Sequence, residues 1–170
     1  LGNMYQQMGQ SEKALAAYDP EGSGDKGAIG MRLMSDMAMV EPARLLARVA
    51  SAAGRPTWQY RFSYVASSLR GKVAGALHAT EIPFVLNTVR AKYGDATTPE
   101  DVAMGRAANA YWVAFAKTGD PGTAADVPKW PRYSAADDVI MDFTLTGPVA
   151  KPDPFKARLD VVEARASHEG

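Results

Sequence analysis

His78 is the residue whose type and setting most readily suggest chemistry, and it is one of only two histidines among 170 residues. Its neighbours are small or apolar, since Gly75-Ala76-Leu77 precedes it and Ala79 follows it. An imidazole on a short loop with small neighbours can take a proton from a weak nucleophile and return it to a leaving group. A histidine held by hydrogen bonds inside the core is the other interpretation, and the spacing alone favours it. The flanking segments must decide between the two.

Composition narrows the classes of protein to consider. A hydrophobic content of 46% and a charged content of 22% are typical of one globular domain. Lys+Arg and Asp+Glu both number 19, without a basic stripe, which argues against a nucleic-acid or anionic-membrane partner. Without cysteine, and with two distant histidines, we expect no disulfide and no metal site. No apolar run approaches the ~20 residues of a membrane span. The sequence opens on Leu1, so it does not indicate a compartment.

Helical segments are predicted at both ends of the chain. Residues 1–19 and 31–54 show helical periodicity, and a turn-rich stretch separates them. Pro42 should begin a new helix or kink a long one, and Gly54 is placed as the residue just past a helix end. Four methionines in the second segment are interpreted as core, with an acyl pocket as the alternative: Met31, Met34, Met37 and Met39. Residues 153–165 should form a closing helix.

The clearest strand signal is in residues 55–65, where large aromatic side chains alternate with polar ones. The aromatic residues are Trp58, Tyr60, Phe62 and Tyr64. A second, shorter strand or edge ribbon is predicted at 137–145. One strong strand rarely makes an independent sheet, because its backbone needs partners on both sides. The fold is therefore predicted to be α/β with further strands outside this chain.

The best-defined helix is predicted at residues 97–119. Thr98 can serve as its N-cap, with Pro99 at the first helical position and Asp101 completing a capping box. Its apolar stripe comprises Met104, Ala108, Tyr111, Trp112 and Phe115, which we interpret as core and not as a ligand cage. Trp130, in the proline-rich loop that follows, is expected to plug that loop against the rest of the protein.

A helical repeat protein is one alternative. Leu1-Gly2, Tyr5, Gly9, Ala14 and Tyr18 fall at tetratricopeptide spacings. One repeat cannot bury its own apolar face, and no second copy follows. The strand predicted at 55–65 is also foreign to a helical scaffold, so this alternative is disfavoured.

From Met34 onward the sequence resembles the C-terminal part of type B carboxylesterases, the family of para-nitrobenzyl esterases and cholinesterases. The matching stretches, in family order, are SDMAMVEPARLLARVASAAGRPTWQYRFSY, GALHATEIPFVLNT, AANAYWVAFAKTGDP, VPKWPRYSAADDVIMDF and DPFKARLD. The resemblance implies the C-terminal portion of an α/β-hydrolase fold that lacks most of the central sheet. Residues 1–30 would be a helical lead-in and linker, and 31–170 the hydrolase segment.

The resemblance also implies roles for residues. His78 corresponds to the catalytic base on the loop after the last central strand. Glu81 resembles the family's acidic residue near the active site and is expected to support the site without being the triad acid. Position 79 is more often Gly or Ser in the family than Ala. The implied reaction is hydrolysis of a small-molecule carboxylic ester by acyl transfer, without a metal or organic cofactor.

The rest of the catalytic machinery is not evident in these 170 residues. In α/β-hydrolases the order is Ser, then Asp or Glu, then His, and the serine stands in Gly-x-Ser-x-Gly. That motif does not occur, and Ser23, in EGSGD, lacks the strand-turn-helix context. Glu21 is the only tempting upstream acid, but a helical pattern precedes it. We therefore expect the nucleophile and acid to come from a missing N-terminal part of the same protein, so that this chain alone is inactive. The alternative within the family is a catalytically dead binding or adhesion module.

Overall fold

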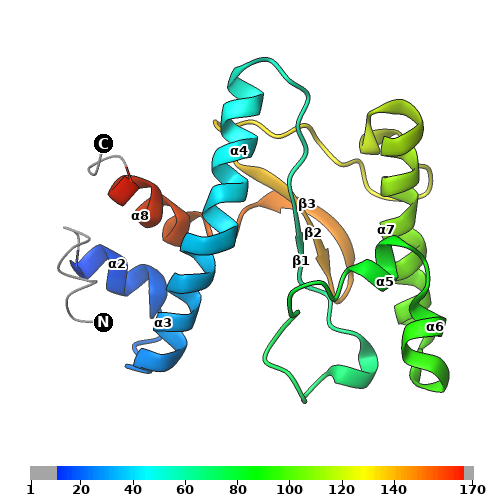
Figure 1. The fold of residues 1–170 in the computed structure, drawn as a ribbon, viewed down its shortest axis with the longest axis horizontal. Helices are drawn as coiled ribbons and strands as arrows, with labels where there is room; N and C mark the ends of the chain where they lie inside the picture. Colours follow the sequence, from blue (N-terminus) through cyan, green and yellow to red (C-terminus); the bar gives the residue numbers. More distant parts are fainter. Residues whose placement is uncertain (1–10, 167–170) are drawn as a thin grey trace. The chain divides into compact units, whose positions relative to one another are not determined.

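The computed structural model describes residues 11–166, which divide into two compact units (Figure 1). Unit 1 comprises the residues up to Arg55 together with those from Asp153 onward, and unit 2 comprises Pro56–Pro152. Most of the tetratricopeptide-like spacing lies outside the described residues, and so does the tail that contains His168.

Unit 1 is helical, and its elements are α2 (Ser11–Tyr18), α3 (Lys26–Ser35), the π-helical turn η1 (Asp36–Val40), α4 (Glu41–Ala52) and α8 (Lys156–Ala166). Its buried core joins α2 and α3 to α8 through Ala14, Tyr18, Ile29, Leu33 and Val161. The predicted closing helix is confirmed as α8, which begins three residues later than expected and extends one residue further.

Pro42 explains the irregular turn between α3 and α4. A proline has no backbone N–H, and its ring clashes with the carbonyl four residues earlier in a regular helix. The chain widens ahead of Pro42 into the π-helical turn, where the Glu41 N–H donates to the carbonyl of Asp36. Pro42 then lies in the first turn of α4, where a missing N–H is not needed. The predicted break at this proline is confirmed, and so is the helix end before Gly54, whose φ is 72°.

The methionines before Pro42 correct the sequence interpretation. Met31, Met34 and Met39 are exposed by 77%, 58% and 58%, so they are not part of the core in this structure. Met37 alone of the four packs against the core of unit 1. Helical periodicity identified an apolar face but could not say which side of the helix would be covered.

Unit 2 contains a three-stranded sheet in the order β1 (Tyr60–Phe62), β2 (Val139–Thr144) and β3 (Gly147–Pro152). β1 runs parallel to β2, with Tyr60 opposite Met141, and β3 returns antiparallel to β2 as a hairpin. The central strand β2 carries the fully buried side chains of Met141 and Phe143. A parallel pair of this kind, joined through helices, is an α/β arrangement.

The strand predicted at 137–145 is confirmed as β2, whereas one strand prediction needs correction and one strand was missed. The strand predicted at 55–65 is regular over only three residues, because among the described residues β1 has a partner strand on one side only. Single hydrogen bonds continue the pairing on either side, from the Tyr133 N–H to Thr57 and from the Ser63 N–H to Phe143. β3 was not predicted, since Gly147, Pro148 and Pro152 disfavour strands. Proline is tolerated there because β3 is an edge strand.

Helices cover the sheet of unit 2 and connect its strands (Figure 1). They are η2 (Ser67–Leu69), α5 (Ile82–Val85), α6 (Val89–Tyr93), η3 (Gly94–Ala96), α7 (Pro99–Thr118) and η4 (Pro121–Thr123). The capping box between Thr98 and Asp101 is confirmed, as is the left-handed cap at Gly119. The predicted apolar stripe is buried from Met104 to Tyr111, whereas Phe115 is 50% exposed. The stripe therefore becomes exposed to solvent toward the C-terminal end of α7.

Candidate functional site

His78 lies at the second position of a β-turn formed by residues 77–80. The Thr80 N–H donates to the Leu77 carbonyl at 3.2 Å, and the Thr80 hydroxyl donates to the same oxygen at 2.7 Å. The His78 side chain is exposed. No residue between 11 and 166 makes a hydrogen bond with its ring. Within the described residues the ring is therefore open to a reactant that faces the turn.

Ala79, the third residue of the turn, has a φ of 64°. Positive φ at this position is the feature of a type II turn, which favours glycine because a Cβ crowds the backbone there. The requirement is set by the turn that presents His78. It gives a physical reason for glycine at position 79.

Replacing Ala79 with glycine is expected to stabilise unit 2 by about 1 kcal/mol, because relief of the left-handed strain outweighs the greater entropy of glycine in the unfolded chain. Chemical denaturation of the 170-residue chain measures the change. Ala91→Gly, at an exposed position inside α6, is the matched control and is expected to destabilise by about 0.5–1 kcal/mol. A loss of stability on Ala79→Gly would contradict the assigned turn.

The segment after the turn is anchored by Phe84, which is 1% exposed. Its ring lies 5.2 Å from those of Phe62 and Tyr64, centroid to centroid, and 6.2 Å from that of Tyr93. Such edge and tilted contacts between buried rings hold a short helix in one position. The cavity beneath the turn measures only ≈ 10 Å³, so the inner side of the loop is filled.

α7 fixes the far end of this segment through one amide and one glycine. The Asn109 side chain donates to the Val85 carbonyl at 2.8 Å and thereby satisfies an end carbonyl of α5. A Cβ on Gly105 would lie 3.4 Å from the Asn87 side-chain oxygen and 3.5 Å from Val89. Glycine at 105 thus lets the chain after α5 approach α7 closely.

Asp101 joins the start of α7 to the chain that leaves β1. One carboxylate oxygen accepts from the Tyr64 hydroxyl at 2.7 Å and the Ser67 N–H at 3.0 Å, and the other accepts from the Thr98 N–H at 3.0 Å. Asp101 is fully buried. Burial raises its pKa, but the hydrogen bonds from Thr98, Ser67 and Tyr64 together outweigh burial, and the pKa is lowered. Burial and the bond to Asp101 raise the pKa of Tyr64 to about 12.

Glu81 stands at the start of α5, three residues beyond His78, and is half-buried. Its carboxylate accepts no hydrogen bond from residues 11–166. Burial raises the pKa of Tyr60, and the negative charge of Glu81 raises it further, which places this charge near the β1 hydroxyl. The structure thus puts Glu81 on the same anchored segment as His78.

Large apolar side chains are exposed in the turn and in α5, which follows it. Leu77, Ile82 and Leu86 are 59%, 50% and 62% exposed. Ile82 and Leu86 are four residues apart, so they share one face of α5 and its last turn. The chain on either side of His78 therefore carries exposed side chains that can contact an apolar group.

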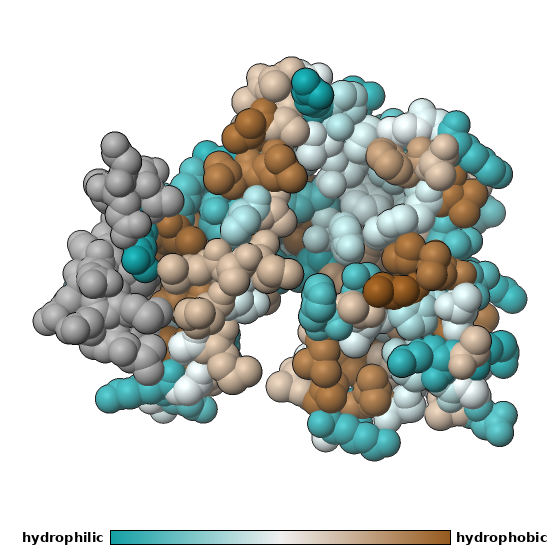
Figure 2. Space-filling model, in the orientation of Figure 1, coloured by the Kyte–Doolittle hydropathy of each residue, from teal (hydrophilic) through white to brown (hydrophobic). Residues whose placement is uncertain are grey.

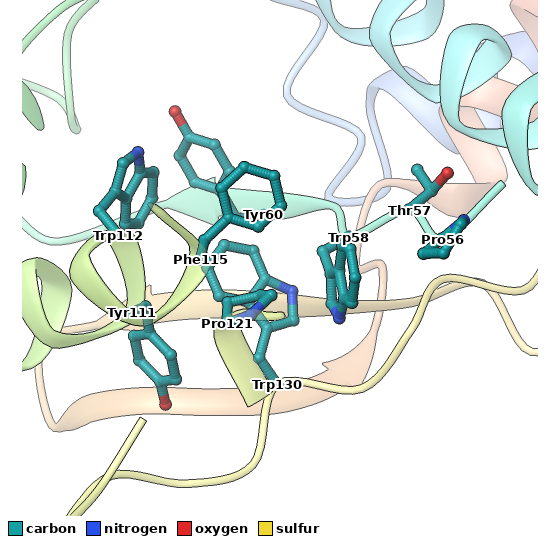
Figure 3. A pocket seen from close by; sticks show the side chains of 9 residues that line it. All are labelled: Pro56, Thr57, Trp58, Tyr60, Tyr111, Trp112, Phe115, Pro121 and Trp130. Atoms are coloured by element: carbon teal, nitrogen blue, oxygen red, sulfur yellow. The ribbon is translucent and has the colours of Figure 1, made fainter. Parts of the chain in front are cut away.

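A separate cavity of ≈ 300 Å³ opens between the β1 segment and α7 (Figure 3). Its lining residues are Pro56, Thr57, Trp58, Tyr60, Tyr111, Trp112, Phe115, Pro121 and Trp130. Figure 3 shows the rings of Tyr60, Phe115 and Trp130 gathered between the β1 segment and α7, with Pro56 and Thr57 to one side. No histidine, serine or carboxylate lines it, so it offers shape and apolar contact without catalytic groups. The sequence interpretation of these aromatics as core missed this opening, although Trp130 is buried as expected, 5% exposed.

A sequence model of the Carboxylesterase family matches residues 4–161, which is most of the chain. The chain belongs to the carboxylesterase family. The resemblance seen from Met34 onward is thereby confirmed. The family match begins well before that residue and includes the first helices.

Individual relatives and one solved structure agree with this carboxylesterase assignment. Carboxylesterase 5A of Felis catus is 33% identical over 116 residues, covering 64% of this chain and 21% of the relative. Para-nitrobenzyl esterase of Bacillus subtilis is 30% identical over 121 residues, covering 68% of this chain and 24% of that enzyme. The crystal structure of the Geobacillus stearothermophilus carboxylesterase EST55 superposes with a TM-score of 0.69 at 26% identity, covering 88% of this chain and 31% of that chain. The carboxylesterase segment therefore has a partial α/β-hydrolase fold and spans between a fifth and a third of these proteins.

The two upstream candidates of this carboxylesterase segment both lie in unit 1. The Ser23 hydroxyl donates to an Asp19 carboxylate oxygen at 2.8 Å, in the turn between α2 and α3. It lies in no strand-turn-helix elbow. Glu21 is exposed in the same turn. Both belong to unit 1, whereas His78 belongs to unit 2.

Across residues 11–166, no group of three or more His, Cys, Asp or Glu side chains is arranged to hold a metal ion. None of the described helices combines the length and apolar character needed to cross a membrane.

Proposed function

We propose that this segment supplies His78 as the catalytic base of a serine carboxylesterase, whose nucleophile and acid lie in a part of the protein outside these 170 residues. The observation that carries the proposal is the presentation of the ring. It is exposed on a β-turn, makes no hydrogen bond with the described residues, and is followed by a firmly packed segment. A base must be fixed in position but open to its reactant, and these features provide both.

The proposed reaction is acyl transfer in two steps. The serine oxygen attacks the ester carbonyl carbon while an imidazole nitrogen of His78 takes the hydroxyl proton. His78 returns that proton to the departing alcohol as the carbon–oxygen bond breaks, which leaves an acyl-serine. Water then attacks this ester, again giving its proton to His78, and the serine oxygen leaves with that proton as the carboxylic acid is released.

Two groups around the turn support the reaction in this proposal. Glu81 is a positioning residue, because it stands at the start of α5, the packed helix that follows the His78 turn. The apolar surface of Leu77, Ile82 and Leu86 suits an ester with an apolar acyl or alcohol group. Glu81 is not assigned as the triad acid, because it lies after the histidine in the chain and the family order places the acid before it.

The test compares the 170-residue chain with the full-length protein encoded around it. We expect the full-length protein to hydrolyse para-nitrophenyl esters and the 170-residue chain to show only the background rate, because a base without a nucleophile has nothing to activate. Absorbance of released para-nitrophenol measures both.

Two results would go against the proposal. Turnover by the 170-residue chain, abolished when Ser23 is changed to alanine, would place the nucleophile inside this segment. A folded full-length protein that binds esters without hydrolysing them, and that lacks a serine elbow, would instead be the catalytically dead member of the family.

A further inference from the structure

Residues 34–53 run from the end of α3 through η1 and α4. Their charged side chains face the protein interior and their apolar side chains face outward, the reverse of an ordinary surface helix. Every exposed residue in this stretch is uncharged. Its charged residues are all buried or half-buried: Asp36, Glu41, Arg44 and Arg48. We call the exposed side of residues 34–53 the outer face.

Three of these charges, Asp36, Arg44 and Arg48, are turned inward and pair with residues of α8. The Arg158 guanidinium contacts both carboxylate oxygens of Asp36, with Nε 2.9 Å from Oδ2 and Nη2 3.1 Å from Oδ1. Asp36 is 1% exposed. Arg44 binds Asp160 at 2.7 Å, and Arg48 pairs with Glu163. The side of α4 toward α8 is therefore held by ion pairs, which leaves its apolar residues to the outside.

The outer face carries five large apolar side chains, each at least half exposed: Met34, Met39, Leu45, Leu46 and Val49. Figure 2 shows hydrophobic residues gathered over α4 on the visible side of the molecule. Soluble domains rarely leave a contiguous apolar area of this kind in water, and a helix with apolar residues outward and paired charges inward is covered on both sides.

We propose that the outer face is an interior surface of the complete carboxylesterase, covered by an apolar surface of the polypeptide that lies outside these 170 residues. The solved structure of EST55 matches 88% of this chain with only 31% of its own, so in that protein most of the polypeptide is additional to this segment. The inference rests on family membership and the arrangement of charges, and it does not depend on the role of His78.

A lipid surface fits the outer face less well. Helices that lie on membranes carry lysine and arginine beside their apolar face to meet anionic headgroups. Here the arginines of the stretch, Arg44 and Arg48, are directed to acidic residues of α8. The outer face has no charge to offer a headgroup, whereas an uncharged apolar protein surface needs none.

The test is Leu46→Glu, made in both the full-length protein and the 170-residue chain. Leu46 is 70% exposed in the chain, so there the change should leave the circular dichroism spectrum intact and reduce self-association in gel filtration. In the full-length protein the carboxylate would be buried against an apolar partner, and the soluble folded yield should fall at least about tenfold. Leu46→Met, and Arg106→Glu at an exposed position of α7, are the controls and should change neither protein.

Each other outcome identifies a different occupant and overturns the proposal. A full-length protein that tolerates Leu46→Glu, with the 170-residue chain changing from dimer to monomer, would make the outer face an interface between copies. If the full-length protein instead loses binding to phosphatidylcholine vesicles while staying folded, the occupant is a lipid surface. A destabilised 170-residue chain would mean that Leu46 is already covered there. A normal folded yield of full-length Leu46→Glu, with or without esterase activity, would likewise overturn the proposal, whereas loss of activity in folded His78→Ala concerns only the proposed function.

Discussion

Replacing His78 with alanine in the full-length protein should lower ester turnover by roughly four to six orders of magnitude. Without the imidazole, the serine hydroxyl keeps its proton at neutral pH and the leaving alcohol departs without one. The loss should appear in kcat, because His78 acts on the reacting atoms and contributes little to binding of the ester. Steady-state hydrolysis of para-nitrophenyl acetate measures kcat and KM separately.

The structure makes this substitution unusually easy to interpret. His78 is exposed and makes no hydrogen bond with residues 11–166, so its removal should change the free energy of unfolding by less than about 0.5 kcal/mol. Glu81→Gln is the companion variant, and it should retain most of the turnover because Glu81 acts only through His78. Near-normal turnover of folded His78→Ala would remove His78 from the mechanism. An equally complete loss in Glu81→Gln would mean that Glu81 does more than position the imidazole.

The sequence predicted the elements whose signals are local. The capping box between Thr98 and Asp101, the stop at Gly119 and the break at Pro42 are each decided within a few residues of the backbone, and all three occur as expected. The alternating aromatics of 55–65 likewise identified the strand that leads to the His78 loop.

Features that depend on distant parts of the chain were less predictable. The length of β1 depends on which strands lie beside it, and β3 is a strand only because β2 offers it an edge. The exposure of Met34 and Met39 was missed for the same reason, since the helical pattern fixes a face but not its partner.

The candidate site divides in the same way. The chemical type of His78 and its small neighbours could be read directly, and the family resemblance supplied its role. The turn is of type II, with a φ of 64° at Ala79. This backbone conformation could not be predicted from the sequence, because alanine rarely adopts positive φ. Asp101 was identified as a helix cap, but its bonds to Tyr64 and Ser67 cross more than thirty residues and carried no local signal.

Asp101→Asn is expected to destabilise unit 2 by about 3 kcal/mol, the second-largest effect we predict. Each carboxylate oxygen of Asp101 accepts at least two hydrogen bonds, one set from Tyr64 and Ser67 and the other from Thr98. An asparagine must place its NH₂ group against one of these sets, so donor faces donor in a fully buried site. Urea denaturation followed by tryptophan fluorescence measures the change, because all three tryptophans lie in unit 2.

The same carboxylate makes the effect depend on pH in a definite direction. The pKa of Asp101 is lower in the folded chain than its ordinary value of about 3.9, so its stabilisation is complete above that pH and is lost as the pH falls further. The difference between wild type and Asp101→Asn should therefore be full at pH 7 and shrink below about pH 4. Asp95→Asn, at an exposed position in η3, is the control and should change stability by less than about 0.5 kcal/mol. A pH-independent difference, or one below about 1 kcal/mol at pH 7, would show that the carboxylate is not what joins α7 to the chain leaving β1.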